Sequence, residues 1–237
     1  MQIEISGIQI EIEKKNIKNL HLTVVPPNGK VHVSAPLHLS DESIAMFVRT
    51  KLGWIKKQRE IFANQLRQNE REFVSGETLY LFGQQYFLRV EYSYKGNSLV
   101  LSGNEAILTV RKESTASQRE AFVNEWYRTL LKEKIEIYLP KWENITGLHC
   151  DSWQTKYMIT RWGTCNTNTR KIWLNLQLAK KPIECLEYVI LHELAHLKVR
   201  NHSKDFVAIM DQYMPYWRET RKILNDLKLD YLGQCDE

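Results

Sequence analysis

The segment "YVILHELAHLKVRNH", from Tyr188 to His202, has apolar residues on nearly every side of the helix that its spacing predicts. The apolar positions in and just before it are Leu186, Tyr188, Val189, Ile190, Leu191, Leu194, Ala195, Leu197 and Val199. A helix that is apolar all round is packed on all its faces. The chain must therefore surround this helix with other elements, although the segment also carries three histidines and a glutamate that need partners there.

Two of the histidines have the spacing of a metal site. His192 and His196 are four residues apart, so they project from one helix face, while Glu193 points about a quarter-turn away. In this HExxH arrangement the two imidazoles bind Zn²⁺, and the glutamate acts as general base on the metal-activated water, whose pKa falls to about 7. The alternative is a pair of core histidines, with Glu193 on a solvated strip.

A catalytic zinc site usually has a third protein ligand, and His202 is the expected one. It lies six residues after His196, so the helix has to end between them. Asn201, which tolerates the left-handed conformation, and Ser203, a good N-cap for a following helix, favour such a break. The spacing equals that of the metzincin motif, although Val199 stands where metzincins have glycine. The competing third ligands are carboxylates further on, namely Asp205, Asp211 and Glu219.

The N-terminal part of the chain predicts strands interrupted by a helix. Apolar residues alternate with polar ones through the first third, and "PPNG", residues 26–29, indicates a turn between two strands. A period of three to four residues predicts one long helix near 41–69, with Ser40 or Asp41 as its cap. Alternating segments then return up to the polar stretch at 112–117.

This polar stretch is the expected domain boundary. It separates a β-rich N-terminal domain, residues 1–113, from a metal-binding catalytic domain, residues 117–237. The second domain begins with a helix that we expect to end at about Leu139, before Pro140. A hairpin follows at 153–178.

Composition restricts the class of protein. The 237 residues are 43% hydrophobic, which suffices for a core, and no apolar stretch is long enough to span a membrane. The 4 cysteines, Cys150, Cys165, Cys185 and Cys235, form no CxxC pair, and no secretory signal is evident, so we expect a cytoplasmic protein. The net charge of +5 favours an anionic ligand only mildly, and we do not expect nucleic acid or a membrane as partner.

The chain from Trp153 to about Leu224 resembles the YgjP-like metallohydrolases, HExxH proteins related to the SprT-like and WLM zinc proteases. The matching blocks are "RWGTC" (161–165), "IWLNLQL" (172–178), "YVILHELAHL", "NHSKDF" and Pro215 with Tyr216, and "HLTVVPPNGKVHVSAP" (21–36) resembles the family's N-terminal segment. The family usually has serine at Thr164, which keeps a hydroxyl there.

The resemblance implies an α+β protein with a zincin-like C-terminal part made of helices and a hairpin. It also implies zinc, or another divalent transition metal, held by His192, His196 and His202, with Glu193 catalytic. At least one branch of the family is associated with hydrolysis of nucleoside triphosphates, UTP among them, to monophosphate and pyrophosphate. We therefore take this nucleotide reaction as the first prediction and cleavage of peptide bonds as the alternative.

Residues near the helix that carries the HExxH motif bear on the choice between a nucleotide and a peptide substrate. Arg161 could clamp a phosphate or carboxylate, although a structural salt bridge explains it almost as well, and Trp162 could stack a base or pack in the core. The cations available to a nucleotide are Lys156, Arg161, Arg170 and Lys171. A peptidase would instead use the edge of the hairpin to pair with substrate backbone. A further alternative is a non-catalytic DNA-binding module held together by zinc.

Overall fold

The computed structural model describes residues 1–25, 29–64, 71–158 and 161–226. The chain divides between Glu70 and Arg71 into two compact units, each with its own core. Helices and strands are mixed in both, so the predicted α+β class is confirmed. None of the described helices is long and apolar enough to cross a membrane.

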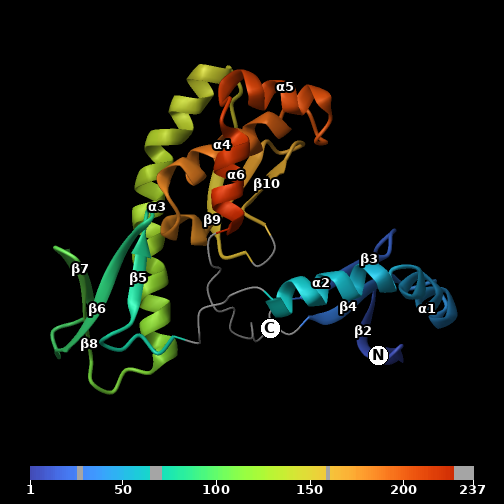
Figure 1. The fold of residues 1–237 in the computed structure, drawn as a ribbon, viewed down its shortest axis with the longest axis horizontal. Coiled ribbons are helices and arrows are strands. Elements are labelled where there is room, and N and C mark those ends of the chain that lie inside the picture. Colours follow the sequence, from blue (N-terminus) through green and yellow to red (C-terminus); the bar gives the residue numbers. More distant parts are fainter. Residues whose placement is uncertain (26–28, 65–70, 159–160, 227–237) are drawn as a thin grey trace. The chain divides into compact units, whose positions relative to one another are not determined.

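The first unit contains a four-stranded sheet and two helices (Figure 1). The strands are β1 (Gln2–Ile5), β2 (Ile8–Lys15), β3 (His21–Val25) and β4 (Lys30–Pro36), in the order β1-β2-β4-β3, and β2 and β4 are parallel. Alternate residues of β2 and β4, such as Ile10 and Val33, are buried with Ile44 of the first helix. The predicted turn at 26–29 falls between β3 and β4, and residues 26–28 lie outside the described residues.

The long helix expected at 41–69 is two helices, α1 (Asp41–Thr50) and α2 (Leu52–Asn64). Ser40 caps α1, because its Oγ accepts a hydrogen bond from the Ser43 N–H. At Lys51 the backbone leaves the α conformation and its N–H donates to the Val48 carbonyl, three residues back, which ends α1. Residues 65–69 of the predicted helix lie outside the described residues.

The second unit begins with a sheet that packs on a long helix. The strands are β5 (Thr78–Leu81), β6 (Gln84–Tyr92), β7 (Ser98–Ser102) and β8 (Glu105–Val110), in the order β5-β6-β8-β7, and the helix is α3 (Ala116–Thr146). Leu88 and Leu108 of the sheet share one core with Val123 of α3, and the Tyr127 hydroxyl donates to the Tyr80 carbonyl at 2.8 Å. The division therefore differs from the boundary expected at 113–117, because the strands before it and the helix after it bury their apolar faces against each other.

Helix α3 continues through Pro140, whereas the sequence analysis expected it to end there. Pro140 removes one intrahelical donor, and the carbonyl that loses it belongs to Glu136. Both residues lie on the exposed side of the helix, where water can satisfy that carbonyl. On the opposite side Leu139 and Trp142 are buried, so packing continues across the proline.

The remaining elements surround the apolar helix. They are β9 (Ser152–Lys156), β10 (Gly163–Asn166), β11 (Lys171–Asn175), the 3₁₀ helix η1 (Leu176–Lys180), α4 (Ile183–His196), α5 (Lys204–Tyr213) and α6 (Trp217–Asp226). The expected hairpin is β10–β11, and β9 adds to it in parallel on the other side of β11. Helix α4 contacts α3, α5, α6, β10, β11 and η1, which explains why it is apolar on every face.

The turn between β5 and β6 lies against the start of α4. The Phe82 N–H donates to the Ala179 carbonyl at 2.8 Å, and Gly83, with φ +87°, would place a Cβ 3.0 Å from Pro182 Cγ. Gly103, in the turn between β7 and β8, also has positive φ (+58°) but has open space around it. The two glycines thus share a backbone requirement and differ in packing.

We expect Gly83→Ala to destabilise the protein by about 1 kcal/mol more than Gly103→Ala. Both replacements strain a backbone at positive φ, but only the Cβ added at Gly83 also comes too close to Pro182. Urea denaturation of both variants measures the difference. Equal midpoints would show that the β5–β6 turn does not support α4.

Candidate metal and catalytic site

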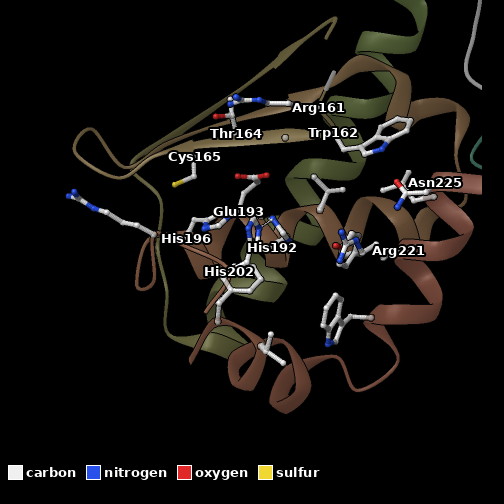
Figure 2. Close-up of a pocket in the computed structure, with 18 of the residues that line it drawn as sticks. Arg161, Trp162, Thr164, Cys165, His192, Glu193, His196, His202, Arg221 and Asn225 are labelled. Carbon is white, nitrogen blue, oxygen red and sulfur yellow. Dashed lines mark hydrogen bonds between the residues drawn. The ribbon is translucent and has the colours of Figure 1, made fainter. Parts of the chain in front are cut away.

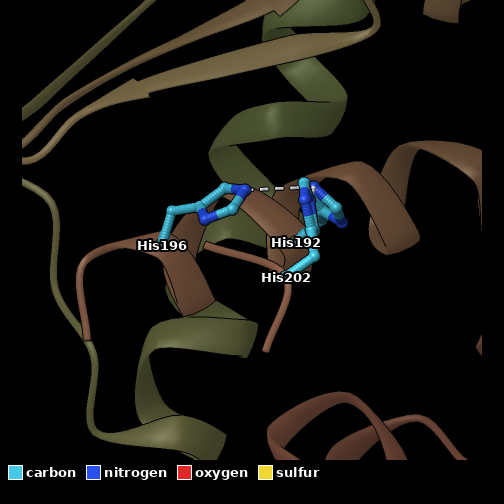
Figure 3. Close-up of side chains that lie close together, drawn as sticks. All are labelled: His192, His196 and His202. Carbon is cyan, nitrogen blue, oxygen red and sulfur yellow. Dashed lines mark hydrogen bonds between the residues drawn. The ribbon is translucent and has the colours of Figure 1, made fainter. Parts of the chain in front are cut away.

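His192, His196 and His202 come together because the chain turns sharply after α4. The helix ends at His196, and the N–H groups of Leu197, Lys198 and Val199 donate to carbonyls three or four residues back. The chain then reaches Ser203, the N-cap of α5, and returns His202 to the face of α4 that carries the other two histidines (Figure 3). Asn201 does not adopt positive φ, so the break forms without the expected left-handed residue.

The three imidazoles direct their Nε2 atoms at one another. His192 Nε2 lies 3.2 Å from His196 Nε2 and 3.0 Å from His202 Nε2. A tetrahedral Zn²⁺ with Zn–N bonds of about 2.05 Å separates its nitrogen ligands by roughly 3.3 Å. The spacing of the nitrogens therefore fits one small divalent ion.

The protonation states of the histidines also suit a metal. Burial, with the neighbouring His196 and His202, lowers the pKa of His192 to about 3, and burial lowers that of His196 as well. His196 Nδ1 lies 3.1 Å from the Val199 carbonyl, so it carries the proton and leaves the Nε2 lone pair free. Phe206 packs against all three rings, with ring centroids 4.8 to 4.9 Å apart.

The competing carboxylates do not join this cluster. Among the described residues, the group of side chains that could hold a metal consists of the three histidines alone. Asp211 instead accepts hydrogen bonds from Trp217 and Arg218. Asp205 and Glu219 are exposed.

Glu193 lies beside the triad and is almost fully buried, with 5% of the residue exposed (Figure 2). A Cβ at Gly163 would lie 2.6 Å from Glu193 Oε1 and 2.8 Å from its Cγ. The glycine of the "RWG" block thus leaves the space that the carboxylate occupies. Burial raises the pKa of Glu193 to about 8, and the positive charge of Arg161 acts against this shift.

The triad and Glu193 line a cavity of about 730 Å³. Its charged lining residues are Glu193 and three arginines, Arg161, Arg200 and Arg221. Trp162 and Thr164 also line it, and Cys165 contributes a thiol whose pKa burial raises to about 11.

Of the four cations named for a nucleotide, only Arg161 lines the cavity. Lys156, at the end of β9, does not. Arg170 forms an ion pair with Asp151, and Lys171 lies over the Trp173 ring. Arg200 and Arg221 were missed by the sequence analysis, since nothing in the local pattern links them to the metal helix.

The strand nearest to Glu193 has a free edge. Within the described part of the chain, β10 pairs with β11 alone. The Asn175 N–H donates to the Trp162 carbonyl at 2.9 Å, which makes these residues a hydrogen-bonded antiparallel pair. Because such pairs alternate, the backbone N–H and C=O groups of Gly163 and Cys165 point away from β11.

A family model described as "YgjP-like, metallopeptidase domain" matches residues 18–227. No curated protein matches the chain. Among solved structures, the metallopeptidase zymogen of Pyrococcus abyssi abylysin has 21% identity and a TM-score of 0.37, covering 41% of this chain and 99% of its own. The zymogen of Methanocaldococcus jannaschii jannalysin has 23% identity and a TM-score of 0.35, covering 38% and 94%. At these TM-scores neither neighbour supports an inference about this chain.

We expect one divalent ion per chain, and we expect alanine at His192, His196 or His202 to weaken its binding at least ~100-fold, because each replacement removes one ligand. Metal analysis after dialysis and a competition titration measure this. His149→Ala, at an exposed site away from the cavity, is the matched control, and Glu193→Gln should keep the metal. Full metal content in His202→Ala would remove His202 from the ligand set.

In the metal-free protein, Glu193 should make folding less favourable as pH rises. Its folded pKa of about 8 lies above the ordinary 4.5, so between these values the folded state holds a proton that the unfolded state has lost. Glu193→Gln removes this dependence. The free energy of unfolding of Glu193→Gln, relative to that of wild type, should therefore increase from pH 5 to pH 8, by up to about 1.4 kcal/mol per pH unit. Urea titrations in chelator measure it, and a constant difference across this range would contradict the burial of the carboxyl group.

Proposed function

The chain belongs to the YgjP-like family and is a metal-dependent hydrolase, and from this premise we propose that it is a zinc peptidase with Glu193 as general base. The observation that carries the proposal is the convergence of three Nε2 atoms beside a buried carboxylate and a free strand edge. The family description names a metallopeptidase domain, so it supports the peptide-bond alternative better than the nucleotide reaction that the sequence analysis put first.

His192, His196 and His202 are the residues that would hold zinc. When bound, zinc lowers the pKa of a coordinated water, polarises the substrate carbonyl and favours the ionised form of Glu193. Glu193 takes the proton of the attacking water at its carboxylate and delivers it to the leaving amine. A carboxylate can serve both steps, because it accepts the proton as a base and then releases it as an acid.

Arg161 would stabilise the negative charge that develops on the substrate carbonyl oxygen. It lines the cavity, its positive charge acts on Glu193 and, within the described residues, it has no carboxylate partner. Its guanidinium is therefore available to a substrate. The salt bridge that offered the structural explanation of Arg161 is absent from the described part of the chain.

The free edge of β10 would hold the peptide in extended form. An added antiparallel strand would pair with the outward N–H and C=O groups of Gly163 and Cys165. Gly163 lies against Glu193, so a peptide paired with this edge would lie at a fixed distance from the Glu193 carboxylate. A nucleotide has no backbone to use this edge.

The test is a digest of an unfolded protein by the zinc-loaded enzyme, with a nucleoside triphosphate panel and pyrophosphate readout in parallel. We expect peptide cleavage that falls at least ~100-fold in Glu193→Gln, because the base is lost. Gly163→Ala should lose activity similarly, since its Cβ displaces the carboxylate, while zinc content stays unchanged.

Gly53→Ala is the matched control, because Gly53 has open space and an ordinary backbone conformation. Pyrophosphate release that disappears in Glu193→Gln, with no peptide cleaved, would overturn the peptidase in favour of the nucleotide reaction. Peptide cleavage that survives in Glu193→Gln would refute the role of this residue.

A further inference from the structure

We propose that Arg221 and the Tyr188 hydroxyl form a subsite that binds a carboxylate of the substrate, so that the enzyme prefers peptides carrying a carboxylate next to the scissile bond. The carboxylate can be an acidic side chain or the free C-terminus, which have the same chemistry. This inference rests on the proposed peptidase function. It assigns a specificity role to residues that take no part in the reaction itself.

Arg221 lies next to the metal ligands on the side of the cavity formed by α6. Figure 2 shows it beside His192, whereas Arg161 lies on the other side of Glu193. Arg221, Tyr188 and His192 line the same cavity, and the charge of Arg221 lowers the pKa of both the Tyr188 hydroxyl and the His192 ring. Tyr188 precedes His192 by one helical turn, so both project from the same face of α4.

The Tyr188 ring is held rigidly. It is 5% exposed, stacks on the buried Trp217 with an interplanar angle of 2°, and meets the edge of the His192 ring. Tyr188 lines the cavity, and its hydroxyl has no hydrogen-bond partner among the described residues. A fixed, unpaired hydroxyl beside a guanidinium provides a second donor to the same carboxylate.

Arg221 differs from Arg218 and Arg200 because it has no ion-pair or hydrogen-bond partner in the described part of the chain. On the same helix, Arg218 forms an ion pair with Asp211 and lies over the Trp217 ring at 4.5 Å. Arg200, the third arginine of the cavity, donates to Asn168. Arg218 and Arg200 thus have structural partners, whereas Arg221 has none among the described residues.

The charges of the cavity favour an anion at this position. Three arginines and one carboxylate line it, and a divalent ion would add to the excess of positive charge. Like charges that line one cavity repel each other, and a carboxylate bound in the cavity reduces that repulsion. A guanidinium also binds a carboxylate through two parallel charge-assisted hydrogen bonds, which fixes its position.

The experiment compares zinc-loaded wild type with Arg221→Gln on matched peptides. One pair differs by glutamate or glutamine beside the scissile bond, and a second pair ends in a free carboxylate or an amide. We expect the wild type to favour the carboxylate member of one pair at least ~10-fold in kcat/KM, mainly through KM. Arg221→Gln should abolish this preference and keep the rate on the neutral peptide, and Arg221→Lys should restore part of it.

Lys222→Gln is the matched control, because Lys222 is the neighbouring exposed cation on α6 and does not line the cavity. The peptide pair that shows the preference tells whether the subsite binds an acidic side chain or the free C-terminus. Equal rates on both members of both pairs in wild type, or a preference unchanged in Arg221→Gln, would overturn the subsite.

Calorimetric binding of the same peptides to zinc-loaded Glu193→Gln separates this inference from the peptidase proposal. Carboxylate-dependent affinity that requires Arg221, without cleavage by the wild type, would refute the peptidase and leave the anion subsite standing. Cleavage by the wild type without carboxylate-dependent affinity would support the peptidase and overturn the subsite.

Discussion

The burial of α4 on all its faces is the constraint on which the rest of the second unit depends. Helix α3, the β10–β11 hairpin, α5 and α6 each cover one side of it. This packing fixes side chains that hydrogen bonds alone would not hold. His192 Nδ1 is buried with no partner among the described residues, yet the ring is confined between Tyr188 and Phe206. Packing thus orients this ring, whereas a hydrogen bond usually orients an imidazole that binds a metal.

The same burial produces two opposite pKa shifts that a metal hydrolase can use. Loss of water penalises the charged form of any group, so it lowers the pKa of His192 and raises that of Glu193. The imidazole stays neutral and can donate its lone pair, while the carboxyl group can hold a proton near neutral pH. One feature of the fold, the dry interior around α4, therefore shifts the pKa of a neighbouring imidazole and carboxyl group in opposite directions.

The parts of the site that the sequence predicted are those set by local patterns. His192, Glu193 and His196 are positioned by helical periodicity, and His202 follows from the need to end the helix after His196. Long-range packing decided the rest. Pro140 remains inside α3 because residues on the opposite side are buried, and the β5–β8 strands join the second unit because they share the core of α3. Arg221 lies 29 residues beyond His192, and only the fold brings it to the cavity, whereas Lys156, closer to the "RWG" block in sequence, does not line it.

The cavity has two sides that differ in their dependence on exact geometry. On the β10 side, Gly163 lies against Glu193, so a Cβ added there would displace the carboxylate. On the α6 side, Arg221 projects from a helix that packs on α4 but carries none of the three histidines. Replacing residues on α6 can therefore change the charge on this side of the cavity while Glu193 and the three imidazoles stay in place. The charge of the α6 side of the cavity therefore does not depend on the contact between Gly163 and Glu193.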